Sequence, residues 1–250
     1  RAYIAIFIFP TLPRIYYDWI FDNIIMAPTK MNFWTYRVMC DLGHRLHRDF
    51  CFSQIKVPLI NTEMAGQFTL QINSSLIIGI TLGIPYLLWE LWRFIKPALH
   101  DKERKAATGF VFYATLLFFL GVMFGYYVIT PMSIHFLAGF TVSSSIQNFF
   151  DIDSYISSIS TLTLATGIVF ELPILIYILA SLGIMSVKLM RSTRRYAIVV
   201  ILIIAAVVTP TPDALTMTVV SIPLFILYEV SIVVAGLVEK RTIKKEELVS

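Results

Sequence analysis

Two cysteines and two histidines form the densest group of side chains that could bind a metal or form a crosslink. Cys40, His44, His47 and Cys51 follow the pattern C-x3-H-x2-H-x3-C, and the chain has only these 2 cysteines. Zinc prefers these ligand types, but the spacing differs from that of the common zinc fingers. Two lone cysteines in an oxidising compartment are expected to pair. We therefore predict a structural disulfide between Cys40 and Cys51, with a zinc site as the alternative.

A single acidic residue, Glu171, lies near the middle of a long apolar run. A charge at that depth in a membrane costs roughly 2.5–3.5 kcal/mol, so its carboxyl group must be protonated, paired or in contact with water. Two interpretations stay open: a functional group that meets a partner or an ion, or a polar link to a Ser or Thr of a neighbouring helix. Pro173 should kink the helix beside Glu171 and so open a concave surface or a groove for a partner.

Aromatic and acidic residues also gather at residues 85–103, where an apolar run gives way to a basic segment. Physical chemistry alone favours a plain interpretation, in which Phe94 belongs to an interfacial aromatic belt and Glu90 pairs with Arg93 one turn later. Glu103 would then complement the dipole at the N-terminus of the next helix. A binding site at this edge is the competing interpretation.

Motifs of the common enzyme classes are absent from the sequence. It contains no H-E-x-x-H, no G-x-S-x-G and no Walker loop, and we expect no second acid within the membrane to partner Glu171 in a catalytic dyad. Asp213 follows Thr-Pro in the turn T-P-T-P-D, where turn chemistry explains it. We therefore expect no catalytic site, no metal and no cofactor.

The composition is that of a membrane protein. Hydrophobic residues make up 57% of the 250 residues and charged residues 14%, against roughly 25% charged residues in a soluble domain. The net charge is +4, but the basic residues form short clusters between apolar runs, which indicates membrane topology rather than nucleic-acid binding. No linker or low-complexity tract divides the chain, so we predict one membrane domain over residues 1–250.

The apolar runs predict an all-α polytopic fold, because a helix needs about 20 apolar residues to cross a bilayer. The expected transmembrane helices are residues 2–22, 67–92, 107–130, 156–184, 197–208 and 214–238. The fifth is short, so the last two should form a hairpin that thins the bilayer or tilts in it. The chain begins with Arg1 inside an apolar stretch, and we expect a preceding segment to be missing.

Basic clusters predict the orientation. They lie at residues 93–105, 188–195 and 240–245, and the positive-inside rule places all three in the cytoplasm. The loops at residues 131–155 and 209–213 contain no Lys or Arg. Six spans with both termini cytoplasmic satisfy this alternation. The loop at residues 27–66 is also basic, but long loops cross membranes largely regardless of charge, so we place it in the periplasm. The expected location is the inner membrane.

Three motifs together resemble the TatC family of twin-arginine translocase subunits. They are P-Y-x2-W-E-x-W-R-F-I-x-P-A-L-x3-E at residues 85–103, F-E-L-P at 170–173 and A-x3-T-P-x2-D at 205–213. The first outer loop looks like versions from Bacteroidetes-type bacteria. The resemblance implies a cupped fold of six helices with short helices 5 and 6. The family's N-terminal pattern His-Leu-x-Glu-Leu-Arg is absent from this sequence.

The resemblance also assigns roles. It implies that Phe94 and Glu103 bind signal peptides with paired arginines, since a carboxylate accepts a guanidinium through two bonds. It places Glu171, with Pro173, in a concave face where single-span partners of the TatA and TatB type dock, and Asp213 in an outer turn. The expected function is the core of a complex that exports folded proteins with the proton-motive force, in contact with membrane lipid and in several copies. The alternative is a secondary transporter or channel that uses Glu171 to couple protons or ions.

Overall fold

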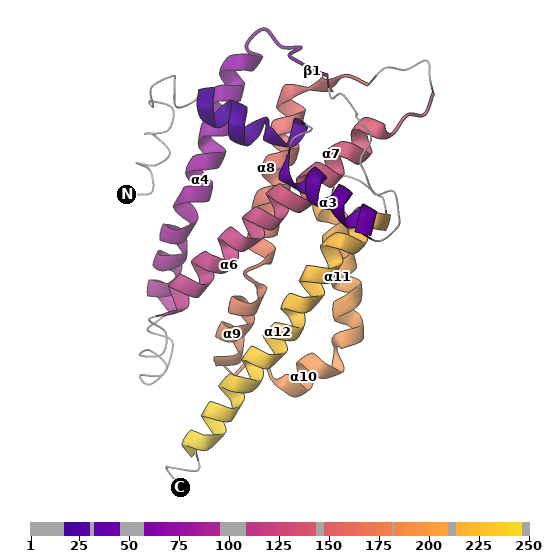
Figure 1. The fold of residues 1–250 in the computed structure, drawn as a ribbon. Helices are drawn as coiled ribbons and strands as arrows, with labels where there is room; N and C mark the ends of the chain where they lie inside the picture. Colours follow the sequence, from indigo (N-terminus) through magenta and orange to yellow (C-terminus); the bar gives the residue numbers. More distant parts are fainter. Residues whose placement is uncertain are drawn as a thin grey trace.

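The protein is a bundle of long helices, and residues 18–30 and 33–45 form a small cap near one end (Figure 1). The computed structural model describes residues 18–30, 33–45, 58–95, 109–143, 148–181, 183–209 and 214–246. The end of the bundle that carries strands β1 and β2 is here called the outer end, and the opposite end is the inner end. The C-terminal part of α12 and helix α10 lie at the inner end (Figure 1).

Four helical stretches among the described residues are long and apolar enough to cross a membrane. They are Gly66–Ile95, Val111–Gly139, Ile152–Ser181 and Thr216–Leu237. The first is α4 (Gly66–Ile95), and the second combines α6 (Phe110–Phe124), the π-helix η6 (Gly125–Ile129) and α7 (Thr130–Gly139). The third combines α8 (Ile152–Val169) with α9 (Leu172–Ser181), and the fourth belongs to α12 (Ala214–Glu246). The fold is therefore all-α and polytopic.

Two helical stretches continue well beyond their predicted C-terminal ends. The predicted helix 107–130 continues to Gly139, because Pro131 stands in the first turn of α7, where its missing N–H group costs no hydrogen bond. The predicted helix 214–238 continues to Glu246. Between α9 and α12 lie α10 (Val187–Ser192) and α11 (Arg194–Val208). At 15 residues, α11 spans about 22 Å, less than a bilayer core.

The predicted outer loop 27–66 contains folded elements. They are the 3-10 helix η3 (Ala27–Thr29), helix α3 (Trp34–Arg45) and strand β1 (Leu59–Ile60). Strand β1 pairs in parallel with β2 (Phe150–Asp151), with Leu59 opposite Phe150. Of the predicted first helix 2–22, only residues 18–22 are described. Residues 18–20 are α-helical and continue into the π-helix η2 (Phe21–Ile25).

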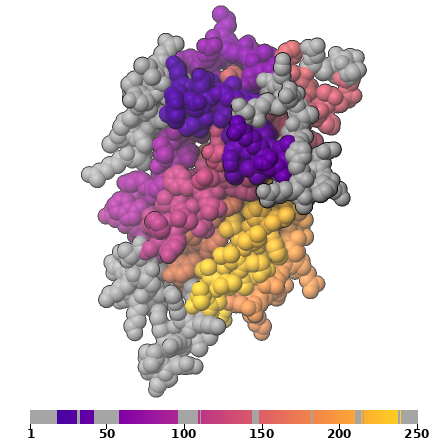
Figure 2. Space-filling model, in the orientation of Figure 1, coloured from indigo at the N-terminus to yellow at the C-terminus, as the bar shows by residue number. Residues whose placement is uncertain are grey.

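Side-chain hydroxyl groups fasten this cap to the long helices. The Tyr155 hydroxyl donates to the carbonyl of Ile25 at 3.0 Å, and the Tyr36 hydroxyl lies 3.4 Å from the carbonyl oxygen of Pro131, in α7, as well as 2.9 Å from that of Pro28 within the cap. Thr35 also donates to the carbonyl of Tyr127, in η6. Burial raises the pKa of Tyr36 to about 12. Figure 2 shows residues 18–30 and α3 lying over the outer half of the molecule. Bonds of this kind satisfy backbone groups that the irregular segment leaves open.

Candidate functional site

The third span is interrupted at Phe170 and Glu171, which form a turn between α8 and α9. Pro173 lacks the N–H group that would bond to the carbonyl of Val169, so a regular helix cannot pass this point. The chain continues through other bonds: Glu171 N–H donates to the carbonyl of Ile168 at 3.1 Å. The kink predicted beside Glu171 thus appears as a two-residue turn, after which the Leu175 N–H resumes the helical bond to the carbonyl of Glu171.

The carboxyl group of Glu171 is buried without a partner. Both of its oxygens are inaccessible, and neither has a hydrogen-bond partner among the described residues. The ion pairs found among the described residues join Glu90 with Arg93 and Glu229 with Arg194. Neither includes Glu171, so no described cation pairs with this acid. A polar group left unpaired in an apolar setting costs about 1–3 kcal/mol. The predicted link from Glu171 to a Ser or Thr is therefore absent from the described residues.

Close packing of α6 on α8 holds this break in place. A Cβ atom added at Gly121 would lie 2.7 Å from the Thr166 carbonyl oxygen and 2.8 Å from Phe170 Cβ. One added at Gly125 would lie 3.0 Å from Thr163 Cα. The glycines therefore let the two backbones approach, as small residues do in membrane helices. Phe170 itself is 3% exposed and belongs to a core cluster with Leu162, Ile201 and Leu224.

The inner end of α4 presents a different kind of surface. Phe94 is 81% exposed, whereas Trp92 is 5% exposed and packs against Ile95 and Val111. Glu90 lies 3.9 Å from Arg93, and the two side chains are 43% and 74% exposed, so this pair contributes about 0–1 kcal/mol. Glu103, the proposed partner of Phe94 in peptide binding, lies outside the described residues.

The other predicted site residues are only partly described. Cys40 lies on α3 and is disulfide-bonded, while Cys51, the other cysteine of the chain, lies outside the described residues. Asp213 also lies outside them. Within the described ranges no group of three or more His, Cys, Asp or Glu side chains could hold a metal ion.

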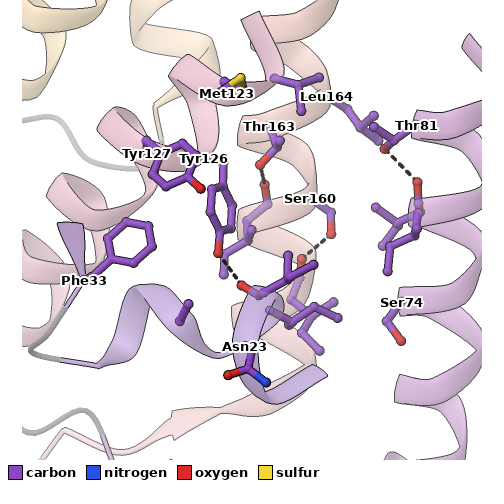
Figure 3. A pocket seen from close by; sticks show the side chains of 18 of the residues that line it. Asn23, Phe33, Ser74, Thr81, Met123, Tyr126, Tyr127, Ser160, Thr163 and Leu164 are labelled. Carbon is purple, nitrogen blue, oxygen red and sulfur yellow. Dashed lines mark hydrogen bonds between the residues drawn. The ribbon is translucent and has the colours of Figure 1, made fainter. Parts of the chain in front are cut away.

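A cavity of about 610 Å³ that the sequence did not predict lies between α4, α6 and α8, beneath the cap. Figure 3 shows hydroxyl groups on two of its walls, Ser74 and Thr81 on one side and Ser160 and Thr163 on the other. Phe33, Tyr126 and Tyr127 line the side opposite Ser74 and Thr81. Hydroxyl residues repeated along two apolar helices were the available signal, but such residues are common in membrane helices and do not predict a cavity.

Known proteins resemble this chain over most of its length. The family model described as Sec-independent protein translocase protein (TatC) matches residues 1–223. The Sec-independent protein translocase protein TatC of Blattabacterium is 41% identical over 225 residues, which are 89% of this chain and 84% of that protein. The TatC protein of Aquifex aeolicus is 34% identical over 192 residues, 76% of this chain and 78% of that one.

Two solved structures also resemble this chain over most of its length. A crystal structure entitled Twin Arginine Translocase Receptor TatC superposes with a TM-score of 0.67 at 29% identity, and the match covers 95% of this chain and 94% of that one. A second structure of the receptor, in the detergent DDM, gives a TM-score of 0.68. These matches lead to one conclusion: this chain belongs to the TatC family of Sec-independent protein translocase proteins.

Proposed function

We propose that this chain is the signal-receiving core of a twin-arginine translocation complex in the inner membrane. The observation that carries the proposal is the unpartnered carboxyl group of Glu171 at the break in the third span. The cost of burying it without a bond is offset when a polar group of a second membrane helix reaches it. Glu171 and Pro173 thus form the docking point for single-span subunits of the TatA and TatB type.

The exposed edge of α4 receives the signal peptide in this proposal. Phe94 is held out of the bundle while Trp92 anchors the same turn in the core. A side chain so exposed at the end of a membrane helix is available to pack against a peptide. Glu103 supplies the carboxylate that pairs with arginine, and a guanidinium fits it through two parallel bonds that lysine cannot form.

The same proposal sets the topology. The inner end of the bundle carries Arg93 and the basic residues of α10 and the start of α11, so it faces the cytoplasm by the positive-inside rule. The cap, the disulfide of Cys40 with Cys51 and the turn with Asp213 then face the periplasm, and both termini are cytoplasmic. Export of folded proteins draws on the proton-motive force, and several copies of the chain assemble with their partners.

Site-specific photocrosslinking tests the receptor role. A photoreactive residue at position 94 or 103 is exposed to a signal peptide with Arg-Arg or Lys-Lys. We expect crosslinks to the Arg-Arg peptide at both positions and their loss with Lys-Lys. The matched control is position 196, because Tyr196 is also exposed, at 67%, but lies on α11. Equal yields with both peptides would refute recognition of paired arginines.

A secondary transporter or channel is the second candidate, and the same buried carboxyl group favours it, because an unpaired acid in a span is a typical proton relay. Proton flux into liposomes that contain only this chain distinguishes the two. A translocase core without partners and cargo should show no flux above empty liposomes. Flux that disappears in the Glu171→Gln variant would favour the transporter.

A further inference from the structure

The cavity beneath the cap has apolar walls. Its volume of about 610 Å³ falls within the range of about 300–1,000 Å³ that is usual for small-molecule sites. Aliphatic side chains of α4, α6 and α8 supply most of the surface, and they include Ile77, Leu82, Val122, Ile156 and Leu164. None of the described residues that line it is acidic. The surface therefore suits a hydrocarbon chain.

The hydroxyl groups in the walls are compatible with a hydrocarbon occupant, because each donates a hydrogen bond to a backbone carbonyl of its own helix. Ser74 donates to the carbonyl of Leu70 at 2.7 Å and Thr81 to that of Ile77 at 2.8 Å. On the facing wall, Ser160 donates to Ile156 at 2.6 Å. A hydroxyl bonded in this way leaves no buried donor open, so an apolar occupant carries no penalty for covering it.

One end of the cavity, beside residues 22–30 of the cap, carries polar side chains. Lys30 and Asn23 line that end. The Lys30 ammonium donates to the carbonyl of Asp22 at 2.6 Å, which uses one of its three donors. Trp34, which also lines the cavity, is 62% exposed, as interfacial tryptophans are in membrane proteins. The Lys30 ammonium therefore has further hydrogen-bond donors available at one end of an apolar cavity.

We propose that this cavity binds one acyl chain of an anionic phospholipid whose phosphate is held by Lys30. The two parts of the site match the two parts of the ligand, with charge at the interface and aliphatic wall below it. The bound chain fills a space between helices that would otherwise lack packing contacts. The proposal does not depend on signal recognition, since it concerns the outer end of the bundle.

Crosslinking with a photoreactive lipid tests the site. The protein is placed in nanodiscs that contain phosphatidylglycerol or phosphatidylcholine with a diazirine in one acyl chain, and labelled peptides are identified by mass spectrometry. We expect phosphatidylglycerol to label Leu82, Met123 and Leu164 more strongly than the exposed face of α11. Lys30→Gln should lower that labelling about fivefold and leave phosphatidylcholine labelling unchanged. Lys188→Gln, an exposed lysine at the inner end, is the control.

A second variant separates the chamber from the headgroup site. Ser160→Trp fills the space, so it should lower labelling by both lipids. Equal labelling of the cavity walls and of α11, or no effect of Lys30→Gln, would overturn the proposal. A twin-arginine peptide that labels the walls in nanodiscs where neither lipid does would also overturn it and assign the cavity to the peptide.

Discussion

Replacing Gly121 with alanine should destabilise the protein, because α6 and α8 touch there through their backbones. The added methyl group would lie 2.7 Å from the Thr166 carbonyl oxygen and 2.8 Å from Phe170 Cβ. Neither atom can move without its helix. Overpacking of this kind costs about 1–3 kcal/mol, and in a chain of this size each kcal/mol lowers Tm by about 2–4 °C. We therefore expect a loss of about 2–12 °C.

Gly83 provides the matched control. It lies inside α4, and a Cβ atom there would have no atom within 4 Å. Alanine favours a helix by about 1 kcal/mol over glycine, so Gly83→Ala should keep or raise the Tm. Both variants and the parent chain would be heated in one detergent while tryptophan fluorescence is recorded. Equal melting of the two variants would refute the argument from backbone approach.

Three further predictions concern single side chains. Glu171→Ala should lower crosslinking to TatA-type and TatB-type helices. It should leave the Tm unchanged or raise it, because it removes an unpaired buried group. A lower Tm would show that Glu171 is structural. The Asp151 carboxyl has a lowered pKa, chiefly because the Thr62 hydroxyl donates to it at 3.0 Å, so its contribution to stability should be present above about pH 4 and be lost as pH falls through the lowered value. Asp151→Asn should show a smaller loss of Tm between neutral and acidic pH than the parent chain, and parallel curves would contradict this. Burial raises the pKa of Tyr36 to about 12, so stability should fall as pH rises from about 10 to 12; Tyr36→Phe should lack that fall in a series of unfolding curves, and an identical fall would exclude Tyr36 as its source.

Local signals in the sequence predicted the spans and the break. Apolar runs of sufficient length appear as α4, as α6 to α7, as α8 to α9 and as α12. Pro173 predicted the interruption beside Glu171, because the loss of one N–H group acts within a single helical turn. The end at residue 130 differed, since a proline at the start of a helical turn looks the same in sequence as one that ends a helix.

Residue types and their order along the chain therefore determined the membrane class, the basic clusters at one end and the family motifs. Only the tertiary structure decided which of these groups have partners. That the Glu171 oxygens are buried and unpaired depends on neighbours from other helices. The cavity under the cap also depends on distant parts of the chain. The hydrogen bond from the Tyr155 hydroxyl to the carbonyl of Ile25, 3.0 Å long, joins the cap to α8 across residues that are far apart in sequence. Periodicity reports what one helix can bury, whereas a cavity is the space left when several helices meet.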